Sequence, residues 1–131
     1  MISEKAFEVE NLTCKFDNLC ILDNVSFSVE RGQFLVIVGP SPSGKSTLLN
    51  CIAGLEEISC KSICVNGESL INVPPHERNI SLIFQDLALF PHMNVFDNIA
   101  FGLRMRGISK NETKKRVDEV ISHLYNVTQG F

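Results

Sequence analysis

The sequence has no hydrophobic run that approaches the roughly eighteen apolar residues of a membrane span. It has no basic excess either, because 12 Lys and Arg stand against 15 Asp and Glu, for a net charge of −3. A nucleic-acid-binding domain would show a basic patch or stripe, so we expect no nucleic-acid partner. No signal-peptide hydrophobic region follows Met1. We therefore expect a cytoplasmic protein.

Metal-binding and disulfide patterns are also missing. The five cysteines are an odd number, contain no C-x-x-C pair and have no histidine at a metal-ligand spacing. A cytoplasmic chain that is 44% hydrophobic can build an apolar core without disulfides, so reduced thiols are expected. No internal repeat or low-complexity tract interrupts the sequence.

One stretch carries a strong chemical signal. Residues 39–47 fit the phosphate-loop pattern G-x-x-x-x-G-K-[ST], between an apolar run at 33–38 and a helical pattern from Ser46 to Leu55. Such a loop turns backbone N–H groups and a helix N-terminus toward phosphate oxygens. Lys45 would reach the β- and γ-phosphates, and the Ser46 hydroxyl would coordinate Mg²⁺. The predicted nucleotide contacts in the loop are Gly39, Pro40, Ser41, Ser43, Gly44, Lys45, Ser46 and Thr47.

The strand patterns predict an α/β protein with two kinds of sheet. Residues 6–16 and 25–29 alternate as half-buried antiparallel strands do, and residues 62–65 before Asn66-Gly67 indicate a hairpin with a type I′ turn. Residues 33–38 and 79–84 are apolar on both faces, which is typical of parallel strands covered by helices. The sequence thus predicts a partial parallel phosphate-loop core plus an antiparallel portion, with the sheet type changing at Gly32.

Helix boundaries are also readable. Gly54 can end the helix that follows the loop, and Asn94 can cap a helix that Gly107 ends. Ser109 and Glu112 form a capping-box pattern that opens a last helix. These last two helices predict the beginning of a helical portion.

The loop at 39–47, Phe84-Gln85, residues 89–93 (Leu-Phe-Pro-His-Met) and residues 98–100 (Asn-Ile-Ala) together resemble the ATP-binding subunits of ATP-binding-cassette (ABC) transporters. The importer branch is similar in having a Pro-x-x-x-Arg-x-Ile segment, here ending at Arg78 and Ile80. This resemblance implies ATP and Mg²⁺ as cofactors, and an ATPase that drives solute import. It also implies a membrane permease subunit and a second ATP-binding subunit as partners, on the inner face of the cell membrane.

The resemblance adds two site residues. It implies that Phe16 stacks on adenine, and that Gln85 contacts Mg²⁺ and the attacking water and senses the permease. Lys45 and Gln85 are thus the expected catalytic residues, and Ser46 and Gln85 the expected metal ligands. Gln85 follows an apolar segment, at the kind of strand end where open α/β sheets bind ligands. A strand-terminal polar residue and a core aromatic are the plainer alternatives for Gln85 and Phe16.

Two departures from the family pattern bear on activity. No hydrophobic strand in 1–131 ends in an acidic pair, and the family's Leu-Ser-Gly-Gly-Gln signature and switch histidine are missing, so the chain resembles the front part of a longer ATP-binding domain. Pro42 stands where the family usually has glycine and offers no N–H to a phosphate. A nucleotide-binding or interaction module without catalysis, and a different phosphate-loop enzyme, therefore remain alternatives.

Overall fold

The computed structural model describes residues 5–128. The chain divides between Leu82 and Ile83 into two compact units, which we describe separately. The first contains four strands and a helix, and the second contains two helices. The sequence-based expectation of a mixed α/β protein is met at this level.

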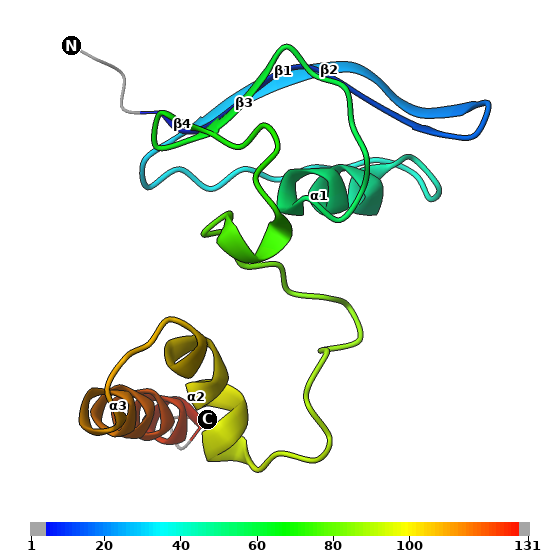
Figure 1. Cartoon of the computed structure of the whole chain (residues 1–131). Coiled ribbons are helices and arrows are strands. Elements are labelled where there is room, and N and C mark those ends of the chain that lie inside the picture. Colours follow the sequence, from blue (N-terminus) through cyan, green and yellow to red (C-terminus); the bar gives the residue numbers. More distant parts are fainter. Residues whose placement is uncertain (1–4, 129–131) are drawn as a thin grey trace. The chain divides into compact units, whose positions relative to one another are not determined.

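The first unit is built on an antiparallel sheet with the strand order β2-β1-β3-β4 (Figure 1). β1 (Lys5–Phe16) and β2 (Leu19–Glu30) form a long hairpin whose turn lies at residues 17–18. Asn11 and Asn24 both have positive φ where the register shifts, and the Asn11 side-chain amide donates to the Asn24 side-chain oxygen. The hairpin is therefore bulged along its length rather than regular.

A second hairpin completes this sheet. β3 (Ser62–Val65) pairs with β1, and β4 (Glu68–Ser69) pairs with β3. Asn66 and Gly67 between them have φ values of 50° and 83°, as a type I′ turn requires. The hairpin predicted from Asn66-Gly67 is confirmed.

Helix α1 (Lys45–Ala53) packs on one face of the sheet (Figure 1). Its Leu48 and Cys51 enter the same buried cluster as strand residues such as Leu12, which is completely buried. Gly54 ends the helix in the left-handed conformation, with φ of 82°, as predicted. After β4 the chain makes a single 3-10 turn, η1 (Pro75–Glu77). The core of this unit is the contact between α1 and the sheet.

The second unit pairs α2 (Val95–Met105) with α3 (Lys110–Thr128). Asn94 caps α2 through a 2.8 Å bond from the Asp97 N–H, and Gly107, with φ of 72°, follows the helix end. Ala100 and Val117 are completely buried in this unit. Both predicted helices are therefore present, with the cap and terminator that the sequence indicated.

The predicted parallel strands are not formed. Residues 33–38 and 79–84 have no strand structure, and Phe34 and Val38 are 89% and 85% exposed. A strand requires a neighbour that accepts and donates ladder hydrogen bonds, and within residues 5–128 no other segment pairs with either one. The sheet type therefore does not change at Gly32, and all pairing in the described part is antiparallel.

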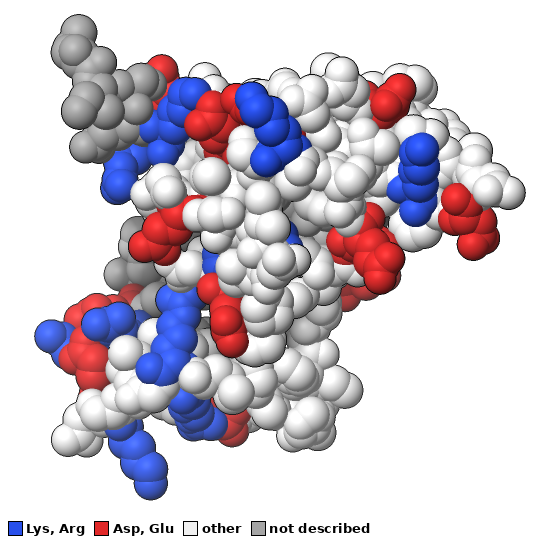
Figure 2. Space-filling model, turned by 45° about the horizontal axis from the view of Figure 1, so that its top comes forward, with Lys and Arg blue, Asp and Glu red and all other residues white. Residues whose placement is uncertain are grey.

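Figure 2 shows charged side chains of both signs on one face of the molecule. On the face drawn in Figure 2, Lys and Arg side chains alternate with Asp and Glu, without a field of one sign. Several are paired, including Lys61 with Glu10 at 2.7 Å and Lys114 with Asp118 at 2.8 Å. These pairs are exposed and contribute little to stability.

Candidate functional site

The phosphate-loop residues lie directly before α1, in the first unit. Gly44 stands at the N-cap position with φ of 83°, and a β-carbon there would lie 2.9 Å from Leu22 Cδ2. Glycine is therefore needed twice, once for the left-handed backbone and once for the close approach to β2. The glycine that the motif specifies seats the beginning of α1 on the sheet.

The Lys45 ammonium folds back over the loop that precedes it. Its Nζ donates to the carbonyl oxygens of Gly39 at 2.8 Å and Pro40 at 2.7 Å, and to the Ser43 hydroxyl at 2.9 Å. These three bonds hold the loop around the ammonium group, so that a cation lies at the centre of the loop. An anion that binds there meets a positive charge already held by the loop.

The first turn of α1 supplies further donors. The first helical bond described runs from the Leu48 N–H to the Gly44 carbonyl at 2.8 Å, so the N–H groups of Lys45, Ser46 and Thr47 precede the intrahelical ladder. The Ser46 side chain is exposed, and its hydroxyl has no hydrogen-bond partner in the part of the chain that is described. Backbone N–H groups, an ammonium and a free hydroxyl at a helix N-terminus fit a phosphate chain, and the hydroxyl oxygen fits a hard cation such as Mg²⁺.

The other two predicted site residues lie elsewhere. Phe16 is the last residue of β1, in the same unit as the loop, and is 45% exposed. It is therefore at the surface rather than in the core. Gln85 lies in the second unit, in a tight turn closed by the Leu87 N–H and the Phe84 carbonyl at 3.1 Å, and its side chain is exposed. The structure thus groups the loop residues together and describes Gln85 in a separate unit.

Arg78 has a role that sequence reasoning missed. The residue is only 8% exposed, and its guanidinium binds the end of α1, donating to Ile52 O at 2.9 Å and Cys51 O at 3.3 Å, and also to Val73 O at 2.8 Å. Burial lowers the pKa of this guanidinium. A cation at a helix C-terminus satisfies the last carbonyls and complements the helix dipole. The Pro-x-x-x-Arg spacing marked this position but not the contact.

Asn98 has a comparable role in the second unit. Its side chain accepts from the Phe90 N–H at 2.9 Å and donates to the carbonyls of Phe90, Met93 and Asn94 at 3.0–3.2 Å. One asparagine on α2 therefore folds the preceding segment onto the helix. Phe90 is fixed further by its ring, whose centroid lies 4.5 Å from that of Phe101.

Comparisons with known proteins agree with these motifs. The profile of the family described as "ABC transporter" matches residues 22–129, a span that includes the phosphate loop, Arg78, Gln85 and Asn98. The match covers most of the chain, so the chain belongs to the ABC transporter family. Membership decides against the alternative of an unrelated phosphate-loop enzyme.

Individual relatives are named as import proteins. The spermidine/putrescine import ATP-binding protein PotA of Thermotoga maritima is 44% identical over 114 residues, covering 87% of this chain and 31% of the relative. PotA of Nitrosospira multiformis is 44% identical over 126 residues (95% and 35%), and the maltose/maltodextrin import ATP-binding protein MalK of Vibrio cholerae is 40% identical over 121 residues (88% and 32%). The chain spans about a third of the length of these curated relatives.

Two further findings concern the membrane and metals. No helix between residues 5 and 128 combines the length and the apolar character needed to cross a bilayer. Among the same residues, His, Cys, Asp and Glu side chains form no group that could hold a metal ion by themselves. A site in which the Ser46 hydroxyl binds an ion together with phosphate oxygens is of a different kind, because the phosphates supply most of the charge.

Proposed function

We propose that this chain is a nucleotide-binding part of the ATP-binding component of an ABC importer, and that its phosphate loop binds the triphosphate of ATP. One observation carries the proposal: the loop surrounds the Lys45 ammonium, and the unbonded N–H groups of Ser46 and Thr47 lie at the same helix N-terminus. The relatives' names, which include "ATP-binding", support the choice of nucleotide.

Each loop residue then has a defined task. Lys45 exchanges its carbonyl partners for β- and γ-phosphate oxygens, which are stronger acceptors because they are charged. The N–H groups of Gly44 to Thr47 orient the phosphates at the positive end of α1. Ser46 would hold Mg²⁺, whose chemistry there is to neutralise charge on the phosphates, and Gln85 is the second metal ligand that the family resemblance implies. Phe16 offers an exposed ring on which adenine can stack.

In this proposal the chain works at the inner face of the membrane without entering it. A permease subunit forms the path of the solute, and a second ATP-binding subunit completes the nucleotide site. Gln85 senses the state of the permease. The relatives are named for polyamines and for sugars, and those substrates belong to the relatives. For this chain we therefore propose only that the cargo is a small solute. No nucleic-acid partner is expected from a net charge of −3.

Binding without catalysis is the second candidate. Hydrolysis requires a carboxylate that orients water beside the γ-phosphate, and no acidic pair follows an apolar strand in this sequence. Gln85 alone can position water but cannot supply that charge. We therefore expect the 131-residue chain to bind ATP and to release no phosphate above background.

Fluorescent-ATP titration in Mg²⁺ buffer tests the proposal. Lys45→Ala should weaken ATP binding by at least about tenfold, because one charge-assisted contact is worth roughly 1.5 kcal/mol or more. Lys61→Ala is the matched control, since Lys61 is an exposed lysine of the same unit that pairs with Glu10. Equal ATP affinity of the parent and Lys45→Ala would refute the phosphate-loop assignment. Steady phosphate release by the parent, absent in Lys45→Ala, would instead refute only the non-catalytic candidate.

A further inference from the structure

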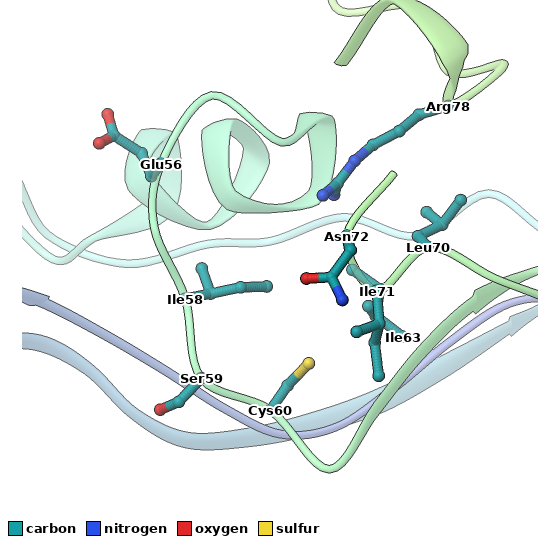
Figure 3. Close-up of a pocket in the computed structure, with 9 residues that line it drawn as sticks. All are labelled: Glu56, Ile58, Ser59, Cys60, Ile63, Leu70, Ile71, Asn72 and Arg78. Atoms are coloured by element: carbon teal, nitrogen blue, oxygen red, sulfur yellow. The ribbon is translucent and has the colours of Figure 1, made fainter. Parts of the chain in front are cut away.

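A cavity of about 320 Å³ lies in the first unit, beyond the C-terminal end of α1 and away from the phosphate loop at its start. Its walls come from the loop after α1, from β3 and from the segment that leads to η1 (Figure 3). A volume of this size accommodates a small organic molecule. The proposed function uses none of the residues that line it.

A buried positive charge forms one wall of this cavity. Arg78 as a whole residue is only 8% exposed, yet within the described residues its guanidinium has no carboxylate partner. Its hydrogen bonds to three carbonyls use Nε and Nη1, and no described residue accepts from Nη2. Carbonyl dipoles satisfy part of the charge, and Nη2 keeps contact with solvent, since no buried side-chain nitrogen or oxygen among the described residues lacks a partner. The cavity wall thus offers an unneutralised cation with donors to spare.

The remaining walls divide into polar and apolar parts. The Asn72 amide and the Cys60 thiol both point into the cavity, whereas the Glu56 carboxylate at its rim is turned away (Figure 3). Burial raises the pKa of the Cys60 thiol although the Arg78 charge opposes this shift, so the thiol is neutral and does not serve as the counter-ion. The apolar part is made by Ile58, Ile63, Leu70 and Ile71.

We propose that this cavity is a binding site for a small organic carboxylate with an apolar tail. The carboxylate lies between the Arg78 guanidinium and the Asn72 amide, which are both hydrogen-bond donors, and the tail lies against the isoleucine side chains. An inorganic anion would satisfy Arg78 but leave the apolar walls exposed to water, so the shape and chemistry favour the organic ligand. This inference does not depend on nucleotide binding.

Isocaproate, a branched carboxylate, is the probe, and isocaproamide is its neutral isostere. Proton–nitrogen NMR follows the Arg78 Nε–H and Asn72 side-chain signals during titration of the 131-residue chain. Isocaproate should move both signals saturably and bind about tenfold more tightly than isocaproamide, because its hydrogen bonds are charge-assisted. Titration with inorganic phosphate separates an organic site from a simple anion site.

Two variants and one control variant locate the ligand. Cys60→Phe fills the cavity without removing Arg78 and should weaken isocaproate about tenfold or more. Cys20→Phe, at an exposed cysteine of β2, should leave affinity unchanged. Asn72→Gly removes the amide at a residue whose φ of 61° suits glycine, and it should reduce the preference for carboxylate over amide. If Cys60→Phe fails to fold, Asn72→Gly decides the question.

The proposal would be overturned by the absence of a saturable shift with isocaproate, by equal binding of the amide, or by unchanged affinity in both Cys60→Phe and Asn72→Gly. Phosphate binding as tight as isocaproate binding would likewise reject the organic ligand.

Discussion

Residues 33–38 are richer in apolar side chains than strand β1, but only β1 forms a strand. Val9 and Leu12 of β1 are 1% and 0% exposed, whereas Phe34 and Val38 are almost fully exposed. The two differ in their neighbours. β1 pairs with β2 across a short turn and with β3 on its other side, while in the described chain residues 33–38 have no ladder partner.

This difference shows what an apolar run does and does not determine. An antiparallel partner can be supplied by the adjacent stretch of chain, but a parallel partner needs a crossover of a dozen or more residues. Hydrophobicity favours burial, and burial of a strand requires hydrogen-bonded neighbours for its backbone. The exposed apolar segment that remains is a surface prone to association.

Truncation of one side chain in each region should have the most different effects on stability. Leu12→Ala should lower the free energy of unfolding by about 2–5 kcal/mol, because it leaves a cavity in the core of the first unit. Val38→Ala should change it by less than about 0.5 kcal/mol, because the side chain is already in water. Urea unfolding followed by circular dichroism measures both. Similar losses in the two variants would mean that residues 33–38 are buried in solution.

Two glycines extend the comparison, Gly32 just before residues 33–38 and Gly44 within the phosphate loop. Gly32 and Gly44 both have positive φ, at 74° and 83°, so alanine should cost each about 1 kcal/mol in backbone strain. At Gly44 the added methyl group also meets Leu22 Cδ2 at 2.9 Å, whereas at Gly32 it meets nothing within 4 Å. We therefore expect Gly44→Ala to cost roughly 2–3 kcal/mol in total, about twice the cost of Gly32→Ala. Equal urea midpoints would show that α1 does not pack on β2 in solution.

What the sequence could predict follows the same division. The turn at Asn66-Gly67, the Asn94 cap and the Gly54 terminator act within a few residues of themselves, so each could be identified from local pattern and each is present. The strands at 33–38 and 79–84 depend on distant partners, which a local pattern cannot supply. In the candidate site, the motif predicted Lys45 and Ser46, but it did not predict the bonds from Lys45 to its own loop. The Arg78 contact with α1 joins positions 26 and 27 residues apart and had no local signature.

The burial of Cys51 between α1 and the sheet should also affect how the free energy of unfolding depends on pH. Burial raises the pKa of the Cys51 thiol to about 12, above its ordinary value of 9.0. The unfolded chain therefore loses this proton first, so the stabilising effect is complete below about pH 8.5 and declines as the pH rises toward 12. The decline attributable to this thiol should be at most about 1.4 kcal/mol per pH unit.

Urea unfolding under reducing conditions, at several values between about pH 8 and pH 10, measures that slope in the parent and in Cys51→Ala. Cys51→Ala lowers stability at every pH because it opens a cavity, but its stability should fall less steeply with rising pH. Identical slopes would indicate that water reaches the thiol, and hence that the face of α1 is not sealed against the sheet.

The smallest expected effect tests local stabilisation in the second unit, where only Ala100, Thr113 and Val117 are buried in the described residues. Asn94 Oδ1 accepts the Asp97 N–H at 2.8 Å, whereas Ser109 Oγ lies 3.4 Å from the Glu112 N–H. The shorter bond is the better cap, so Asn94→Ala should destabilise α2 by about 1 kcal/mol, and Ser109→Ala should destabilise α3 by less than about half of that. Amide hydrogen exchange reports each helix separately, and the Asp97 amide should exchange about fivefold faster in Asn94→Ala. If both variants accelerate exchange equally, the difference in cap geometry has no energetic meaning, and the helices owe their boundaries to the contact between α2 and α3 instead.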